Sequence, residues 1–211
     1  MTDTAQTTRE RLLEAARELF TTTGYHDTTT PILARRAGVA EGTIYRHFPS
    51  KQALLNAAYQ ETQRWGSEMV REVSGGTARS VGERLGALGR TWLEQAEQDP
   101  ARIRLLLAWR QLRELDELSR AAASELRTGL EHLIALGKQQ GTVRAGVVEL
   151  WAAVWLALVT FAVEKVAGKE WQPTHPHALA TLDAAWEAIA WRPITMGAGS
   201  TPADPATEDV S

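Results

Sequence analysis

One stretch of fourteen residues, GVAEGTIYRHFPSK, holds two glycines, a Thr, a Tyr, a His and a Lys between two longer amphipathic segments. Thr43 and His47 are four residues apart and therefore share one face of a helix, with Tyr45 beside them. Hydroxyl and imidazole groups can donate hydrogen bonds, and Lys51 adds a positive charge. This combination suits contacts with phosphate oxygens and with the polar edges of bases.

Three predicted helices position this stretch. Thr7 and Glu10 have the spacing of a capping box, and apolar residues then recur at helical spacing until Gly24. Thr29 or Thr30 caps a second helix, which has a proline in its first turn. The quoted stretch supplies the third helix.

The third helix is predicted to have a buried side and an exposed side. Ile44 and Phe48 are one turn apart and form the buried stripe. Gly38 ends the preceding helix, and Ser50 caps a longer helix that begins at Lys51. Two short helices joined by a tight glycine-containing turn are typical of a helix-turn-helix, although a short helix in any all-α core could show the same pattern.

The rest of the chain predicts further helices and no strands. Glycines and prolines separate these helices at turns, and the expected ranges are 81–97, 101–115, 117–140, 147–167 and 176–191. From residue 193 the chain is rich in Pro, Gly, Ser and Thr, so it cannot bury enough apolar surface to fold. The prediction is an all-α protein of about nine helices with a disordered tail.

The segment RLLEAARELFTTTGYHDTTTPILARRAGVAEGTIYRHFPSKQALL resembles the N-terminal domain of the TetR family of bacterial transcriptional regulators. The similarity lies in a first helix ending in LF…GY, the threonine run, LA…AGV, GTIYRHF and SK…L. The resemblance covers about the first quarter of the chain. It implies a helix-turn-helix DNA-binding domain at 1–52, a helical effector-binding and dimerisation domain at 53–192, and the tail at 193–211.

The resemblance also implies a homodimer that binds double-stranded DNA and represses transcription until a small molecule binds the body. Two heads set about 34 to 36 Å apart fit successive major grooves, so a pseudo-palindromic operator is expected. The alternative is a ligand-independent DNA-binding protein, or an activator, of the same fold. The residues that the resemblance places on DNA are Thr29, Thr30, Gly42, Thr43, Tyr45, His47 and Lys51.

Two positions depart from the family pattern. Ala40 stands where a serine commonly caps the third helix, and Glu41 stands where a basic or polar residue is common. A carboxylate at position 41 would repel phosphate unless it is turned away or paired, and it could also accept a hydrogen bond from N4 of cytosine. The sequence leaves the role of Glu41 open.

The apolar segment VVELWAAVWLALVTFAVEKVAG predicts a helix that is covered on both sides. With the last helix, it would form the surface on which two copies meet as a four-helix bundle, the usual arrangement in the resembled family. Packing within one chain is the alternative. The residues expected on the dimer surface are Trp151, Trp155, Leu158, Ala162 and Trp186.

The chain contains 8 tryptophans, and several fall where the resembled family keeps its effector pocket. Large aromatic side chains with few polar partners suit a small apolar or aromatic ligand, although core packing explains the same residues. The residues expected to contact the effector are Trp65, Met69, Trp92, Trp109, Arg110 and His132.

Composition and spacing argue against other classes of function. The chain has no cysteine, which excludes disulfides, thiolate metal sites and cysteine nucleophiles. It lacks a Gly-rich phosphate loop and His and carboxylate pairs at metal spacing, so no enzymatic activity, catalytic residue, metal or cofactor is expected. The polar N-terminus and an apolar run shorter than the roughly 18 residues that span a bilayer predict a cytoplasmic protein without a membrane partner.

Overall fold

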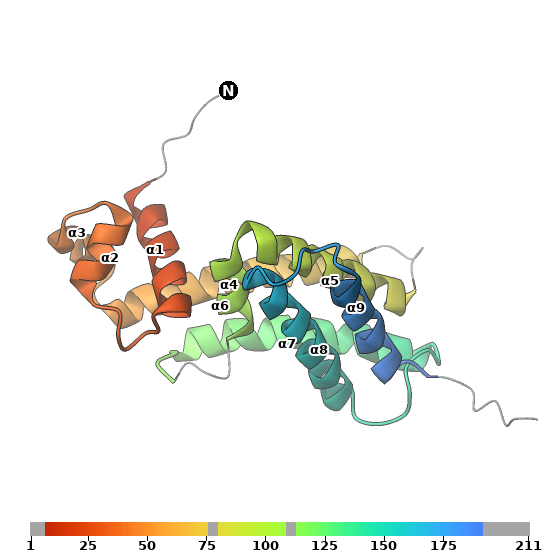
Figure 1. Cartoon of the computed structure of the whole chain (residues 1–211). Helices are drawn as coiled ribbons and strands as arrows, with labels where there is room; N and C mark the ends of the chain where they lie inside the picture. Colours follow the sequence, from red (N-terminus) through yellow and green to blue (C-terminus); the bar gives the residue numbers. More distant parts are fainter. Residues whose placement is uncertain (1–6, 76–79, 109–112, 192–211) are drawn as a thin grey trace, which may run out of the picture.

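The computed structural model describes residues 7–75, 80–108 and 113–191. Within these ranges the chain forms nine α-helices and no strand, so the all-α prediction is confirmed. Figure 1 shows a small N-terminal head of three helices joined to a longer helical body. The helices are α1 (Thr8–Thr22), α2 (Thr30–Ala37), α3 (Glu41–His47), α4 (Lys51–Ser74), α5 (Val81–Gln98), α6 (Pro100–Leu107), α7 (Glu117–Gln139), α8 (Val148–Ala167) and α9 (Pro176–Ile189).

Local sequence signals set the helix ends in the head. The capping box is present: the Thr7 amide donates to the Glu10 carboxylate at 2.8 Å, and the Glu10 amide donates to the Thr7 hydroxyl. Gly38 ends α2 with a φ of 64°, a left-handed conformation that favours glycine. Ser50 caps α4 by accepting a hydrogen bond from the Ala53 amide.

The hydrophobic core of the head is completed by residues of the body. Leu12 of α1, Leu33 of α2 and Ile44 of α3 are all fully buried in one cluster. The same cluster contains Leu105 of α6 and Leu115 of the segment before α7. Because these two side chains come from beyond α4, the position of the head depends on packing against the body.

The predicted helix over 101–115 is wrong at its C-terminal end, because α6 ends at Leu107. The polar side chains of α4 hold the segment that follows. Gln52 and Asn56 each donate a side-chain hydrogen bond to the carbonyl oxygen of Glu114. These contacts satisfy the Glu114 carbonyl oxygen from another helix, where a helical hydrogen bond was expected.

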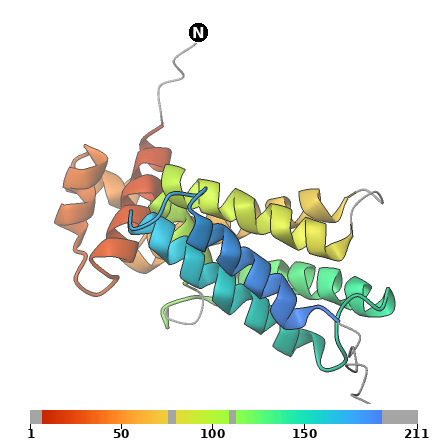
Figure 2. The same cartoon turned by 45° about the vertical axis from the view of Figure 1, so that its right-hand side comes forward.

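The body is built around two tryptophans. The rings of Trp92 on α5 and Trp155 on α8 have centroids 5.8 Å apart, and both side chains are buried. Figure 2 shows α8 and α9 running side by side on one face of the body. By length and composition alone the 20-residue α8 could cross a membrane, but in this structure it packs against α5, α6, α7 and α9. The expected tail at 193–211 lies outside the described residues.

Candidate functional site

Helix α3 separates its apolar and polar side chains as predicted. Ile44 is fully buried and Phe48, which follows the helix, is 4% exposed. Tyr45 is 53% exposed, His47 is exposed and Thr43 is half-buried. The helix therefore presents a hydroxyl, a phenol and an imidazole to solvent while its other side is fixed in the head core.

Gly42 leaves open space beside this polar face. A methyl group added at Gly42 would meet no atom within 4 Å outside its own helix turn. Packing within the head therefore does not require glycine at this position, which fits its predicted role of letting another molecule approach the backbone closely.

The carboxylate of Glu41 is paired. The Thr30 hydroxyl, at the start of α2, donates to Oε1 of Glu41 at 2.9 Å. Ala40 gives α3 no side-chain cap, and Thr29 makes no capping hydrogen bond for α2. One hydrogen bond thus joins the N-termini of α2 and α3. It turns the Glu41 carboxylate toward Thr30, so this carboxylate is paired within the head.

Lys51 holds the loop between α1 and α2. Its ammonium group donates to the carbonyl oxygens of Tyr25 and Thr28 at 2.8 and 2.9 Å, and it lies 4.2 Å from the centre of the Tyr25 ring. Burial, together with the nearby Glu114, raises the pKa of the Tyr25 phenol. Two of the three ammonium N–H groups are thus used inside the head.

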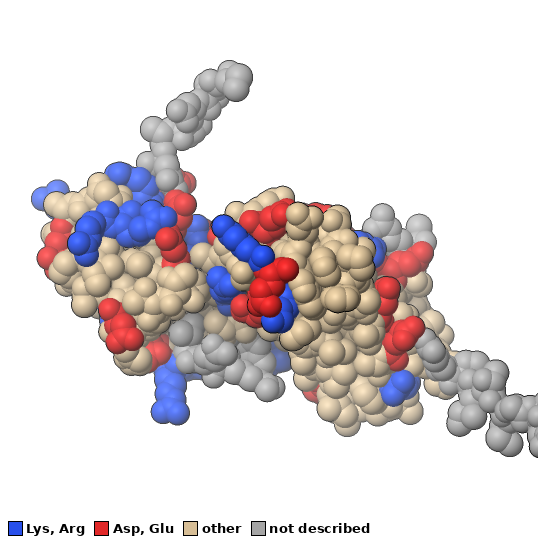
Figure 3. Space-filling view, viewed as in Figure 1, with Lys and Arg blue, Asp and Glu red and all other residues tan. Residues whose placement is uncertain are grey.

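Basic side chains surround the polar face. Figure 3 shows Lys and Arg side chains gathered on one side of the head. The Arg9 guanidinium lies 5.5 Å from the centre of the Phe48 ring, which brings a cation beside the C-terminal end of α3. Arg46 is exposed on α3 itself, whereas Arg36 forms an ion pair with Glu18.

Residues 12–58 match the model of the family described as bacterial regulatory proteins, tetR family. The HTH-type transcriptional regulator UidR of Escherichia coli is 38% identical over 68 residues, which are 32% of this chain and 35% of UidR. Residues 12–58 therefore form a tetR-family domain. The match spans about a third of the length of UidR.

Solved structures extend the likeness in fold to the body. A TetR family transcription regulator from Marinobacter aquaeolei VT8 superposes with a TM-score of 0.74 at 20% identity, covering 88% of this chain and 96% of that one. The SmeT–triclosan complex superposes with a TM-score of 0.67 at 21% identity, covering 96% of this chain and all of SmeT. The arrangement of the described helices therefore matches the fold of both structures in the body as well as in the head.

Two residues expected on the dimer surface are buried inside the protomer. Trp155 is 1% exposed and Ala162 is fully buried. Their placement on a dimer surface is wrong, because α8 is apolar on nearly every side and the sequence did not indicate which side faces α5.

The other three expected dimer residues are half-buried at the edges of α8 and α9. The Trp151 indole donates to the Ala145 carbonyl oxygen at 3.2 Å, and Leu158 packs against the body core. Trp186 packs against Gly82 of α5, where an added methyl group would lie 2.7 Å from the indole. These contacts tie each tryptophan to its own chain.

Exposed apolar side chains mark a different line along α8 and α9. Leu150 is 52% exposed and Phe161 is 50% exposed, with the exposed Ala153 and Ala157 between them on α8. Leu179 of α9 is 37% exposed. Sequence reasoning missed these residues, although the spacing of 150, 153, 157 and 161 is a helical stripe that could have identified them.

The residues expected to line an effector pocket are spread through the body. Trp92 packs on Trp155 in the core, and Met69 is buried on α4. Trp65 is covered by the Arg102 guanidinium, which lies 4.2 Å from the ring centre. Of the expected tryptophans that the structure describes, Trp92 therefore belongs to the core and Trp65 packs against Arg102. Two further expected residues lie outside the described residues: Trp109 and Arg110.

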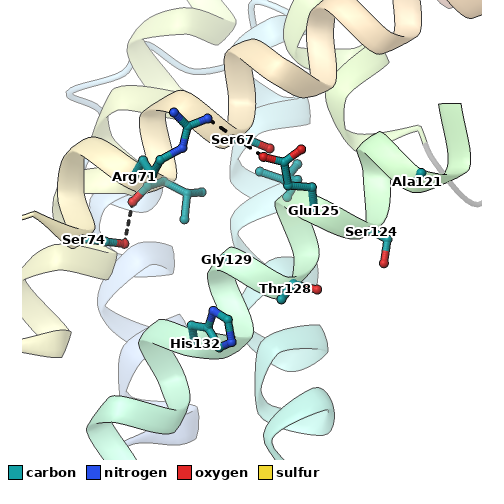
Figure 4. Close-up of a pocket in the computed structure, with 11 residues that line it drawn as sticks. Ser67, Arg71, Ser74, Ala121, Ser124, Glu125, Thr128, Gly129 and His132 are labelled. Carbon is teal, nitrogen blue, oxygen red and sulfur yellow. Dashed lines mark hydrogen bonds and ion pairs between the residues drawn. The ribbon is translucent and has the colours of Figure 1, made fainter. Parts of the chain in front are cut away.

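His132 does line a cavity, of about 700 Å³ between α4 and α7. Figure 4 shows its polar lining, in which Arg71 of α4 points toward Glu125 of α7 at 4.0 Å. Ser67 is 6% exposed, and its hydroxyl has no hydrogen-bond partner among the described residues. Polar side chains therefore line part of this cavity, together with apolar ones such as Val70 and Leu126.

Proposed function

We propose that this protein is a cytoplasmic transcriptional repressor that binds a pseudo-palindromic operator as a homodimer and is released by a small apolar or aromatic ligand. The observation that carries the proposal is the construction of α3 within a tetR-family head. Its apolar residues are buried, and Thr43, Tyr45 and His47 project from the other side.

Each polar group has a role that its position supports. The first residues of a recognition helix meet base edges in the major groove, which places Gly42 and Thr43 against the bases. Tyr45 and His47 donate to phosphates on either side, and the amides at the start of α2, with Thr29, hold another phosphate. Lys51, which holds the loop between α1 and α2, donates its remaining N–H to a phosphate of the DNA backbone.

A second copy is needed because one head reads only a few base pairs. The exposed line of Leu150, Ala157, Phe161 and Leu179 is an apolar surface of the kind that two-fold dimers bury. Pairing α8 and α9 with their copies places two identical heads on one side of the assembly. The symmetry of the dimer then dictates the symmetry of the operator.

Ligand release is supported by the way the head is held. Because Leu105 and Leu115 complete the head core, a ligand that moves α6 or the start of α7 changes the orientation of the head. SmeT, which has the same fold, is known as a complex with triclosan, an aromatic molecule. The ligand must bind the DNA-free arrangement more tightly for release to follow.

The proposal is tested by footprinting the purified protein on the DNA that flanks its own gene. Protection of one site of about two helical turns with two-fold symmetric contacts, at concentrations that leave unrelated DNA free, is the expected result. Binding should weaken as salt rises, since phosphate contacts release counterions. Equal binding to all DNA, or none, would reject the proposed function.

A further inference from the structure

A second cavity in the body is small and mostly apolar, and one side-chain oxygen without a hydrogen-bond partner among the described residues, Oε1 of Gln63, belongs to its lining. It measures about 30 Å³ and lies among α4, α6, α7 and α8. Its lining includes Leu106, Leu126, Leu130 and Leu156, with Gln63 of α4 as the one uncharged polar side chain. Gln63 is 1% exposed, so its amide is removed from solvent.

The orientation of the Gln63 amide is fixed by the backbone of α6. Its nitrogen donates to the Leu106 carbonyl oxygen at 3.0 Å. Turning the amide over would set its oxygen against that carbonyl oxygen, two acceptors with no proton between them. Oε1 is therefore the atom left for an occupant of the cavity, and it has no hydrogen-bond partner among the described residues.

The cavity adjoins a larger groove. A groove of about 480 Å³ runs between α7 and α8, and it shares Arg127, Leu130 and Leu156 with the small cavity. The Arg127 guanidinium lies 3.7 Å from the Glu131 carboxylate, so the positive charge beside the cavity is paired. The small cavity has room for a group the size of a hydroxyl, and the groove has room for the rest of a small molecule.

We infer that the groove and the small cavity form one site for a neutral, apolar molecule carrying a hydroxyl group, which donates its hydrogen bond to Oε1 of Gln63. A buried acceptor in an apolar pocket selects a donor, and it rejects a carboxylate or an ether oxygen because neither can donate. The inference rests on the proposed function, since it names the chemical class of the effector.

The site has a direct connection to the head. Leu106 packs on the backbone of α4 at Gly66, where an added methyl group would lie 2.4 Å from the leucine side chain. The preceding residue, Leu105, is buried in the head core. A molecule that pushes α6 away from Gln63 therefore disturbs Leu105 as well.

The test compares two probes that differ only at the oxygen, thymol and thymol methyl ether, by calorimetric titration of the full chain. The wild-type protein should bind thymol more tightly by up to about tenfold, the value of one neutral hydrogen bond. Gln63→Leu should remove this preference. The control Gln139→Leu, at the exposed end of α7, should retain it.

A second variant keeps the inference open to refutation if Gln63→Leu fails to fold. Leu156→Phe places a larger side chain in the cavity and should weaken binding of both probes while Gln63 is unchanged. Equal affinity of the wild type for both probes, binding of neither, or a preference that survives in Gln63→Leu would overturn the inference.

DNA binding of the wild type, measured without probe, separates the two proposals. If the protein does not bind its own flanking DNA but binds thymol more tightly than thymol methyl ether through Gln63, the proposed function fails and the ligand site stands. If it binds the DNA and shows no thymol preference, the ligand site fails and the proposed function stands.

Discussion

The head and the body expose opposite kinds of surface. In the head, α3 buries Ile44 and presents Tyr45 and His47, whose polar groups need a polar partner. In the body, α8 buries Trp155 and leaves Phe161 half in solvent. The first surface has the chemistry of one that contacts a charged polymer, and the second has the chemistry of one that contacts another apolar surface.

The two regions also differ in how their cores are closed. The body core is centred on the contact between Trp92 and Trp155, both of which come from the body. The head core is closed by Leu105 and Leu115, which belong to the body. A change in the body can therefore alter the head, and the proposed release of DNA by a ligand depends on this asymmetry.

The strongest test of this comparison removes the centre of the body core. Trp155→Ala should lower the free energy of unfolding by about 3–5 kcal/mol, because it leaves a large cavity beside Trp92. Urea unfolding followed by circular dichroism measures the change. Trp191→Ala, at a 55% exposed position, is the matched control and should change stability by no more than about 0.5 kcal/mol. Similar losses in both variants would contradict the core assignment.

A charge on the exposed line of α8 tests the second surface. Phe161→Glu should weaken dimerisation by roughly 2 kcal/mol or more, because a carboxylate would be buried against an apolar copy. Sedimentation velocity over a dilution series measures the dimer fraction. Leu118→Glu changes an apolar residue of α7 that is 71% exposed and should leave association unaltered. A Phe161→Glu protein that stays dimeric would place the dimer surface elsewhere.

The N-cap residue of α7 is acidic, and it directly follows Leu115, which completes the head core. Asp116 caps α7 by accepting a hydrogen bond from the Ser119 amide at 2.8 Å. Burial acts to raise the pKa of Asp116, but hydrogen bonds from Ser119 and Gln60 outweigh it and hold the pKa below its ordinary value. Asp116→Ala should cost about 1 kcal/mol of stability at neutral pH.

The pH dependence of that loss follows from the direction of the shift. A carboxyl group whose pKa is lowered on folding stabilises the protein above its unfolded pKa, and this contribution is lost as pH falls through the folded value. The stability difference between wild type and Asp116→Ala should therefore shrink below about pH 4. Urea titrations at neutral and acidic pH measure it, and a difference that stays constant into acid would contradict the role of the charge.

The smallest expected effect lies in the head core. Tyr59 is fully buried on α4, its hydroxyl has no hydrogen-bond partner among the described residues, and burial raises its pKa. Tyr59→Phe should leave stability unchanged or raise it by up to about 1 kcal/mol, because an unsatisfied buried hydroxyl is removed. Thermal unfolding measures this, and a clear loss of stability would show that the hydroxyl is bonded.

The sequence predicted those features that depend on neighbours within one turn. The Thr7 capping box, the glycine stop at Gly38 and the buried stripe of α3 involve residues three or four positions apart, and all three are confirmed. The end of α6 was missed because Gln52 and Asn56, which hold the following segment, lie about sixty residues away in sequence.

The candidate sites also differ in whether neighbours in sequence or distant residues determine them. The polar face of α3 follows from a helix of seven residues, so its members could be named from spacing. The position of Trp155 depends on which side of an almost wholly apolar helix meets α5, and the acceptor at Gln63 depends on a carbonyl group of α6. Neither contact can be predicted from the spacing of residues that are close in sequence.

A competition binding assay on the flanking DNA tests whether side chains of α3 contact the operator. Thr43→Ala and Tyr45→Phe are compared with the wild type and with Tyr59→Phe, the matched loss of a buried hydroxyl. Each α3 variant should lose about fivefold or more in specific affinity, the value of one hydrogen bond, at unchanged stability, and Tyr59→Phe should bind as the wild type does. Wild-type affinity in both α3 variants would contradict it.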